Sequence, residues 1–328
     1  MEAQIVETAI LNIINHQSLI ATKAARVVYA ADGDGIMEFG LRRAQGPDAG
    51  LYGARAAMIG GCVGTSNVLA GQLFDVPVKG THAHSWVMSF PDELTAFRTY
   101  ANLFPDACIL LVDTYNTLKS GVPHAIQVFD EMKAAGTLPE KGYGIRLDSG
   151  DLAYLSTECR RILDENGLTG CKIFATNSLD EYLITDLERQ GACIDSYGVG
   201  DAIATSKAAP CFGNVYKLVE IDGEAVLKRS EDKIKLINPG SQITYRIMIN
   251  DPSKGEIFKV DVTCLRGDGL SRKIEAGESF TVCDEYDRYK SKTFEAGEYT
   301  ALKMQHKVIE NGKKCAPEYT LMEKKAYY

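Results

Sequence analysis

The sequence lacks several features that would assign it to a particular class. No apolar run among its 328 residues reaches the roughly 18 residues that a membrane-spanning helix needs, and the first residues contain no leader-like cleavage site. Nine cysteines are scattered singly from Cys62 to Cys315 without a CxxC pair. We therefore expect no disulfide framework or zinc site, a reducing cytoplasm, and cysteines buried as small apolar side chains. The net charge of −8 argues against a protein that mainly holds nucleic acid.

The apolar content of 45% is sufficient for a large core in one barrel-sized domain or in two smaller domains. Residues 3–26 are predicted to form a helix, with one buried stripe of side chains at Val6, Ile10, Ile13, Ile20 and Ala24 that only Gln17 interrupts. Residues 54–71 are rich in glycine and alanine and are expected to form a second helix, closely packed against a neighbour.

From residue 76 onward, strand-like and helix-like segments alternate. Apolar runs predict strands at VPVKG (76–80), CILLVD (108–113), YGIRLD (143–148), KIFATN (172–177) and CIDSYGVG (193–200). Amphipathic segments between them predict helices at 92–104, 124–136, 152–167 and 180–191. Strict alternation indicates βαβ units and a parallel sheet covered on both faces, which is compatible with a (β/α) barrel or a doubly wound sheet.

Polar clusters at the strand ends favour the barrel. THAHS, DTYNT, RLDSGD, TNSLDE and GVGD each lie at or just after the carboxyl end of a predicted strand. Barrel strands direct these ends to one mouth, whereas an open sheet spreads them along an edge.

The pattern changes after residue 213. The segment 215–230 is predicted to form a hairpin with its turn at Asp222–Gly223, and YRIMIND, GEIFKVDV and SFTVCD are predicted as alternating strands. We therefore divide the chain into an α/β barrel at residues 1–213 and a smaller mixed or antiparallel β domain at residues 214–328.

Two histidines, His82 and His84, follow the run VPVKG. A His-x-His pair after a strand is compatible with a metal site, a phosphoryl acceptor or a hydrogen-bonded structural histidine. Metal-dependent barrel hydrolases need further histidines at later strand ends, and here only His124 and His306 lie downstream, neither at a strand end. A phosphoryl acceptor needs one exposed imidazole nitrogen and a neighbour that fixes the tautomer. We interpret His82 as a packing or supporting residue.

The motifs GLRRAQGPD, GTSNVLAG, GTHAHSWV, LLVDTYNTL, IRLDSGDL, SLDE, YGVGD and VYKLVE occur in this order, and the chain resembles the nicotinate phosphoribosyltransferase family over most of residues 3–245. The resemblance implies an irregular (β/α) barrel of the type II phosphoribosyltransferase kind, related to the TIM barrel. It also implies an enzyme of NAD biosynthesis that works as a dimer.

The implied reaction joins nicotinate to phosphoribosyl pyrophosphate (PRPP), giving nicotinate mononucleotide and pyrophosphate. It is coupled to ATP hydrolysis through a phosphohistidine, so the family unites ligase and glycosyltransferase chemistry. Magnesium is expected with PRPP and ATP, and no tightly bound organic cofactor is expected. The AHS motif places the phosphorylated histidine at His84, and Asp148 is expected to face the ribose hydroxyls or the magnesium on PRPP.

The resemblance also assigns substrate-binding roles. Phe39 is expected to stack on the nicotinate ring, while Arg42 and Arg146 balance its carboxylate or a phosphate. Gly150 and its neighbours, at the start of a predicted helix, suit an anion, although Ser149 or Asp151 is equally well read as the helix cap. Thr81 is expected to donate a hydrogen bond to a substrate, and Gly198 and Gly200 to let the backbone approach a phosphate. The remaining expected binding residues are Asn177 and Thr205.

Three positions bear on specificity. Related nicotinamide-using enzymes carry an aspartate close to the position of Ser66, which would repel nicotinate, so the neutral Ser66 predicts preference for the acid. Asp201 stands where the family usually has threonine, and Ser178 where it usually has an acidic residue.

The family normally has a segment upstream of the position where this sequence starts, and that segment supplies part of the mixed domain and a tyrosine over the nicotinate ring. We therefore expect the 214–328 domain to be incomplete and the chain to act as a homodimer or with a separate N-terminal segment. The alternatives to the transferase are a non-catalytic fragment that binds phosphate ligands or a partner, and a metal-dependent hydrolase.

Overall fold

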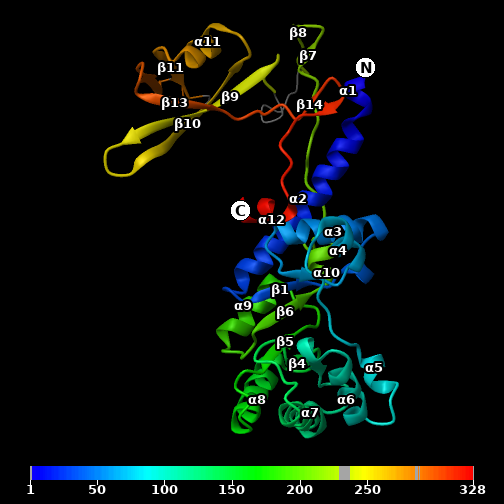
Figure 1. Ribbon diagram of the computed structural model, residues 1–328. Coiled ribbons are helices and arrows are strands. Elements are labelled where there is room, and N and C mark those ends of the chain that lie inside the picture. The colour runs from blue at the N-terminus through cyan, green and yellow to red at the C-terminus, as the bar shows by residue number, and fades with distance from the viewer. Residues whose placement is uncertain (1, 229–236, 285–286, 288, 328) are drawn as a thin grey trace. The chain divides into compact units, whose positions relative to one another are not determined.

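The computed structural model describes residues 2–228, 237–284, 287 and 289–327 (Figure 1). The chain separates into two compact units, Met1–Asn214 with Tyr319–Tyr328, and Val215–Glu318. In the described residues, no helix has both the length and the apolar character needed to cross a bilayer.

The first unit alternates helices and strands. Its elements are α1 (Glu2–Ile5), α2 (Glu7–Ala30), β1 (Gly35–Glu38), η1 (Leu41–Arg43), α3 (Pro47–Ile59), β2 (Gly64–Thr65), α4 (Val68–Phe74), α5 (His84–Met88), α6 (Glu93–Leu103), η2 (Pro105–Ala107), β3 (Ile109–Leu111), η3 (Thr117–Gly121), α7 (Val122–Ala134), β4 (Gly144–Leu147), α8 (Leu152–Glu165), β5 (Lys172–Ala175), α9 (Glu181–Arg189), β6 (Ser196–Val199), α10 (Asp201–Ala204) and α12 (Leu321–Tyr327).

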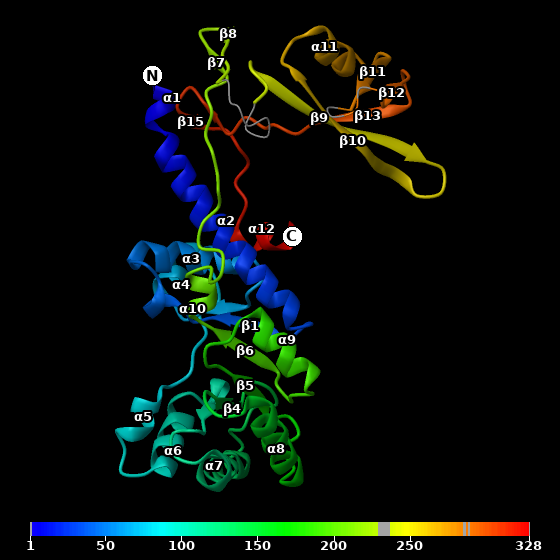
Figure 2. The same ribbon diagram turned by 180° about the vertical axis from the view of Figure 1, so that it is seen from behind.

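The strands form a six-stranded sheet in the order β2-β1-β6-β5-β4-β3, in which every pair is parallel. The sheet curls into a half-barrel, and α9, α8, α7 and α6 follow its outer side (Figures 1 and 2). Most residues of these strands are buried, as expected for a parallel sheet. The structure therefore confirms the α/β barrel class as a half-barrel.

Two predicted elements in the first 80 residues differ from the structure, and one observed strand was not predicted. Residues 54–71 form the end of α3, strand β2 and the start of α4, because the helix stops at Gly60–Gly61, where Gly61 has a φ of 107°. Residues 76–80 make only one bridge, between Val78 and Thr65, and do not form a strand. The short strand β1 was not predicted, because GIME is too short to show a period.

The stripe predicted along the first helix is only half buried. Ile20 and Ala24 pack in the core, whereas Val6, Ile10 and Ile13 are 41%, 40% and 63% exposed. The prediction of one continuous buried stripe was therefore wrong for the first half of α2. Periodicity gives the apolar face of a helix but not the length over which a neighbour covers that face.

The cysteine prediction was correct for only part of the set. The structure buries Cys62, Cys108, Cys159, Cys171 and Cys264 and half-buries Cys193. It exposes Cys211, Cys283 and Cys315, for which the prediction was wrong.

A side chain connects the segment that precedes His84 to the edge of the sheet. His82 is 7% exposed and its Nε2 accepts a hydrogen bond from the backbone N–H of Leu111 in β3, at 3.1 Å. Its ring also packs edge-on against Tyr100, with ring centroids 4.6 Å apart. Imidazole thus satisfies an edge donor that no neighbouring strand reaches. His82 is the buried supporting residue that we expected.

The second unit is built from antiparallel hairpins. Its elements are β7 (Glu220–Ile221), β8 (Glu224–Ala225), β9 (Gln242–Asp251), β10 (Gly255–Leu265), α11 (Gly269–Ala276), β11 (Phe280–Cys283), β12 (Ser291–Phe294), β13 (Tyr299–Lys303), β14 (Ile309–Glu310) and β15 (Lys313–Lys314). Its largest sheet has the order β10-β9-β13. The turn at Asp222–Gly223 is confirmed, with φ of 50° and 85°, while residues 229–230 of the predicted hairpin lie outside the described residues.

Gly121 allows a close approach at the end of β3. A Cβ atom at Gly121 would lie 1.8 Å from the carbonyl oxygen of Val112, which is backbone and cannot move aside. We expect Gly121→Ala to lower the free energy of unfolding by about 3 kcal/mol, because overpacking against backbone forces a shift of α7. Urea denaturation measures this, with Gly213→Ala as the control, since no atom lies within 4 Å of that Cβ position. Equal losses in the two variants would contradict the packing argument.

Burial of His82 should make stability depend on pH. Desolvation lowers the pKa of His82 from 6.5 to about 4, so between these values the folded state binds fewer protons than the unfolded state. Stability should therefore fall as the pH drops from 6.5 to about 4, by up to about 3 kcal/mol. In His82→Gln this part of the pH dependence should be absent, while exposed His306→Gln should retain it. Denaturation curves at several pH values measure the difference, and identical profiles would refute it.

Candidate active site

The residues that follow the carboxyl ends of the strands by one or two positions lie along one edge of the sheet, which we call the mouth; they are Phe39, Ser66, Asp113, Asp148, Thr176 and Gly200. Parallel strands bring these ends together because all of them run in the same direction.

Asp113 is the most connected carboxylate of the mouth. Its side chain is 1% exposed and accepts hydrogen bonds from His84 Nε2 at 3.0 Å, from the backbone N–H of Asp148 at 2.9 Å, and from Ser149 Oγ at 2.5 Å. Asp113 therefore joins the segment after β3 to the loop after β4 and to α5.

His84 is the first residue of α5 rather than the end of a strand. Its side chain is 37% exposed, and its Nε2 is held by Asp113. A carboxylate only accepts hydrogen bonds, so it fixes the tautomer in which Nε2 carries the hydrogen. The Nδ1 lone pair then remains for an incoming electrophile. This is the arrangement that a phosphoryl acceptor requires.

Arg146 points from β4 into the mouth. Its Nη1 donates to the Thr81 hydroxyl and to the carbonyl oxygen of His82, and its Nη2 lies 3.8 Å from Asp148 Oδ1. Burial lowers the pKa of Arg146, the carboxylates of Asp148 and Asp113 raise it, and the charge of Arg42 lowers it further. Two guanidinium groups therefore act on the same space, which suits an anionic substrate.

Phe39 lies over the end of β6. A Cβ atom at Gly198 would be 2.6 Å from Phe39 Cδ2 and 2.7 Å from Thr176 Cγ2, so only glycine lets the ring occupy this position. The hydroxyl of Thr176 donates to Asp148. Gly198 thus has a packing requirement in addition to the expected approach to a phosphate.

The other predicted site residues lie near the strand ends, and as far as the structure describes the chain, their side chains form no hydrogen bond with His84 or Arg146. Ser66 is half-buried beside the end of β1, and its N–H donates to the carbonyl oxygen of Glu38 at 3.1 Å. Gly150, with a φ of 77°, leads into α8, whose cap is Asp151; the Ser149 hydroxyl binds Asp113 instead.

Asn177 and Ser178 have φ of 95° and 51°, a strained backbone directly after β5. Thr205 ends α10 and its hydroxyl donates to the carbonyl oxygen of Asp201, and Gly200 precedes that helix. Within the part of the chain that the structure describes, no side-chain hydrogen bond joins Asn177 or Thr205 to the network around Asp113.

Arg42, His84, Arg146 and Gly198 therefore lie at the same mouth, each linked to it by a contact or a charge effect. The described ranges contain no group of three or more His, Cys, Asp or Glu side chains that could hold a metal ion.

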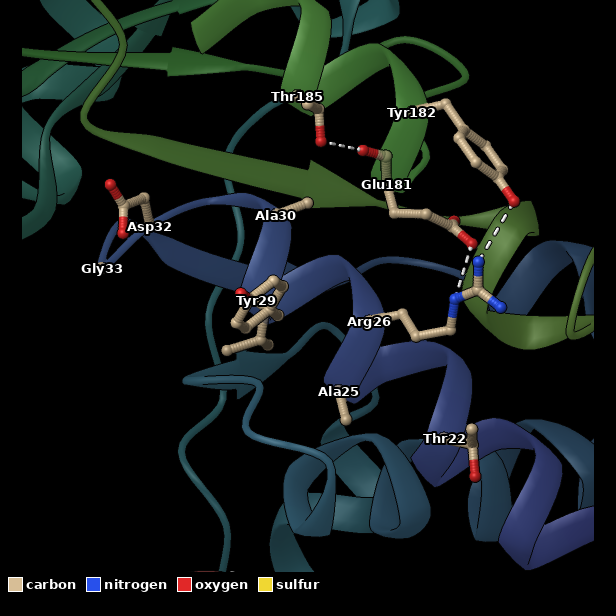
Figure 3. Close-up of a pocket in the computed structure, with 11 residues that line it drawn as sticks. Thr22, Ala25, Arg26, Tyr29, Ala30, Asp32, Gly33, Glu181, Tyr182 and Thr185 are labelled. Carbon is tan, nitrogen blue, oxygen red and sulfur yellow. Dashed lines mark hydrogen bonds and ion pairs between the residues drawn. The ribbon is translucent and has the colours of Figure 1, made fainter.

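A hollow of about 830 Å³ between α2 and α9 is not part of the mouth (Figure 3). Its charged groups satisfy one another: Arg26 Nε lies 3.3 Å from Glu181 Oε1, and Arg26 Nη2 donates to the Tyr182 hydroxyl at 3.1 Å. Lys23 completes a buried ion pair with Glu181 at 2.6 Å. None of the predicted site residues lines this hollow.

Sequence reasoning did not single out Asp113, Glu38 or Thr176 as site residues. Asp113 belongs to the polar cluster DTYNT at the end of a predicted strand, but nothing in the sequence indicated that its side chain contacts His84. Glu38 gave no signal, because β1 itself was not predicted.

Comparison with known proteins agrees with this geometry. Residues 35–177 match the nicotinate phosphoribosyltransferase (NAPRTase) family. The chain is 50% identical over 262 residues to nicotinate phosphoribosyltransferase of Bacillus subtilis, which covers 78% of this chain and 52% of that protein. It is 44% identical over 270 residues to a nicotinate phosphoribosyltransferase of Mycobacterium tuberculosis, covering 82% of this chain and 57% of that protein.

A solved structure of human nicotinic acid phosphoribosyltransferase superposes with a TM-score of 0.76 at 29% identity, covering 98% of this chain and 69% of the human chain. Nicotinate-nucleotide pyrophosphorylase from Pyrococcus furiosus shares the fold, with a TM-score of 0.68, 24% identity, and coverage of 98% of this chain and 71% of that chain. The chain spans about half the length of the curated relatives it matches. The matched family, the identity to its members and the shared fold agree, and the chain belongs to the nicotinate phosphoribosyltransferase family.

Proposed function

We propose that the mouth performs the nicotinate phosphoribosyltransferase reaction, joining nicotinate to PRPP with release of pyrophosphate, in NAD biosynthesis. The observation that carries this proposal is the His84–Asp113 pair, set beside the half-buried Arg146 in a chain of this family.

Nicotinate would bind between Phe39 and Arg42. An electron-poor pyridine ring stacks well on an aromatic face, and a guanidinium balances the carboxylate. Ser66 follows β2, the strand beside β1, and is uncharged. Its hydroxyl can therefore donate a hydrogen bond to the nicotinate carboxylate without repelling it. The other side of the ring would be covered by a segment from a second copy in a homodimer or from a separate chain.

PRPP would occupy the space near Arg146 and the loop after β4. Arg146 and the amides at Gly150, before the 14-residue helix α8, suit its phosphate groups. Magnesium would arrive with the pyrophosphate as part of the substrate, and Asp148 is the carboxylate placed to meet it. Thr176 and Arg146 hold that carboxylate in position.

Coupling to ATP would use His84. The Nδ1 lone pair attacks the γ-phosphorus, an N–P bond forms, the bond to the β-phosphate oxygen breaks, and ADP leaves. The Nε2 hydrogen stays on the hydrogen bond to Asp113, whose negative charge stabilises the cationic imidazole ring. While the histidine is phosphorylated, the nicotinate nitrogen bonds to the ribose carbon, the bond from that carbon to the pyrophosphate oxygen breaks, and pyrophosphate leaves. Hydrolysis of the phosphohistidine by water then releases phosphate and returns the neutral ring, which drives the reaction forward.

The phosphohistidine predicts acid-labile labelling of this chain by ATP that carries radiolabel on its γ-phosphate. His84→Ala should abolish the label, and Asp113→Asn should lower its rate of incorporation by about 100-fold, because the fixed tautomer is lost. His124→Ala is a matched control, since His124 Nδ1 also lies 2.8 Å from a carboxylate, that of Glu93, but on an outer helix. Label that persists in His84→Ala would refute the assignment.

Because Ser66 is uncharged, we expect the enzyme to prefer nicotinate over nicotinamide. Ser66→Asp should lower kcat/KM for nicotinate by about 10- to 100-fold, because two like charges would face each other. Ser66→Ala, which removes the donor without adding a charge, should have a smaller effect. Steady-state assays of nicotinate mononucleotide formation measure both, and an unchanged kcat/KM in Ser66→Asp would contradict the reasoning.

A further inference from the structure

Glu38, the last residue of β1, is a buried carboxylate that the proposed chemistry does not use. It is 3% exposed. Its Oε1 accepts the N–H of Gly40 at 2.5 Å and its Oε2 accepts the hydroxyl of Thr65 at 2.6 Å. One side chain thus joins the connection after β1 to the end of β2, the strand next to it in the sheet.

The environment of Glu38 is costly for a carboxylate. Burial raises its pKa, and the hydrogen bonds from Thr65 and Gly40 oppose that effect. Among the residues that the structure describes, no lysine or arginine forms an ion pair with it. Burying a charged group costs free energy unless its hydrogen bonds compensate, so these two donors are essential to the position of Glu38.

The Gly40 donor lies at a crowded point. A Cβ atom at Gly40 would be 2.4 Å from the Ala204 Cβ and 2.7 Å from the carbonyl oxygen of Gly200. The turn that leads into η1, where Arg42 lies, is therefore fixed by Glu38 on one side and by the connection from β6 to α10 on the other. A small movement of Glu38 must move this turn.

The Thr65 donor lies beside Ser66. Thr65 Oγ1 also accepts the N–H of Asn67 at 3.1 Å, and the carbonyl oxygen of Glu38 accepts the N–H of Ser66 at 3.1 Å. Ser66 is thus held between two residues of the same hydrogen-bond network. The Glu38 side chain therefore connects the loop that carries Arg42 to the loop that carries Ser66 by hydrogen bonds.

We propose that Glu38 is a positioning residue: its buried carboxylate, bonded to Gly40 and Thr65, sets the spacing between Arg42 and Ser66 and so the fit of an aromatic carboxylate between them. This inference rests on the proposed function, because the two residues are assigned there to the nicotinate carboxylate. Glu38 touches no substrate and acts only through the two loops.

Glu38→Gln tests the geometry without any assay of activity. The amide keeps the size of the side chain but has only one acceptor oxygen, so Gly40 and Thr65 can no longer both donate to it, and a remaining bond in which the Thr65 hydroxyl accepts from the amide lacks the carboxylate charge and is weaker. Hydrogen–deuterium exchange should become faster in both loops together, residues 39–45 and 64–68. Glu93→Gln is the matched control, because Glu93 is equally buried at 3% and bonds His124 away from these loops. Unchanged exchange in both loops, or an equal change in the control, overturns the proposal.

Steady-state kinetics then distinguish a positioning role of Glu38 from a general loss of folded enzyme. Glu38→Gln should raise the KM for nicotinate about tenfold and change kcat less than about threefold, since misplaced binding groups weaken the fit of the substrate. Thr65→Val, which loses the hydroxyl, should shift KM in the same direction, and Thr65→Ser, which keeps it, should shift KM less. A fall in kcat with unchanged KM, or equal KM values in the two Thr65 variants, overturns the proposal.

The two experiments also distinguish this inference from the proposed function. If the wild-type chain neither binds nicotinate in calorimetry nor forms nicotinate mononucleotide, the proposed function fails. Coupled loss of protection in the two loops of Glu38→Gln would still show that Glu38 sets their spacing. If the wild type is active and the loops and KM do not respond, only the role of Glu38 fails.

Discussion

The carboxylate of Asp113 is the contact on which the rest of the mouth depends. It is 1% exposed and receives three hydrogen bonds, so removing any donor would leave a buried charge partly unsatisfied. The imidazole of His84, the turn at Asp148 and the hydroxyl of Ser149 are therefore held together by a common acceptor. The loop after β4 then places Asp148 between Arg146 and Thr176. The position of the His84 ring and the course of the loop after β4 therefore depend on the same buried group.

The mouth contains two positively charged arginines although the chain as a whole is negatively charged. The protein carries a net charge of −8, yet Arg42 and Arg146 act on one space, and burial of Arg146 strengthens its field there. Asp113, Asp148 and Glu38 are each tied to hydrogen-bond donors, which limits their repulsion of an anionic substrate. The mouth thus places two cationic side chains near each other on a protein whose net charge is negative.

Sequence reasoning succeeded where the physics is local and periodic. The helices α6 to α9 and strands β3 to β6 have clear apolar patterns and were found, and Asp148 and Ser149 lie at the carboxyl end of β4, where the sequence predicted the end of a strand. It failed where a tertiary neighbour decides. GIME is too short to show a period, the exposed half of α2 keeps its apolar pattern without a covering neighbour, and residues 76–80 look extended but pair only at Val78. Asp113 was in view, but its bond to His84 spans 29 positions in sequence and cannot be read from spacing.

Side chains hold the segment before His84 at the edge of the sheet, where a backbone ladder would otherwise run. The His82 imidazole accepts the N–H of Leu111, and Arg146 donates to the Thr81 hydroxyl and to the His82 carbonyl oxygen. A ladder would hold this segment whatever its side chains were, whereas here its course depends on the identity of two residues, His82 and Arg146.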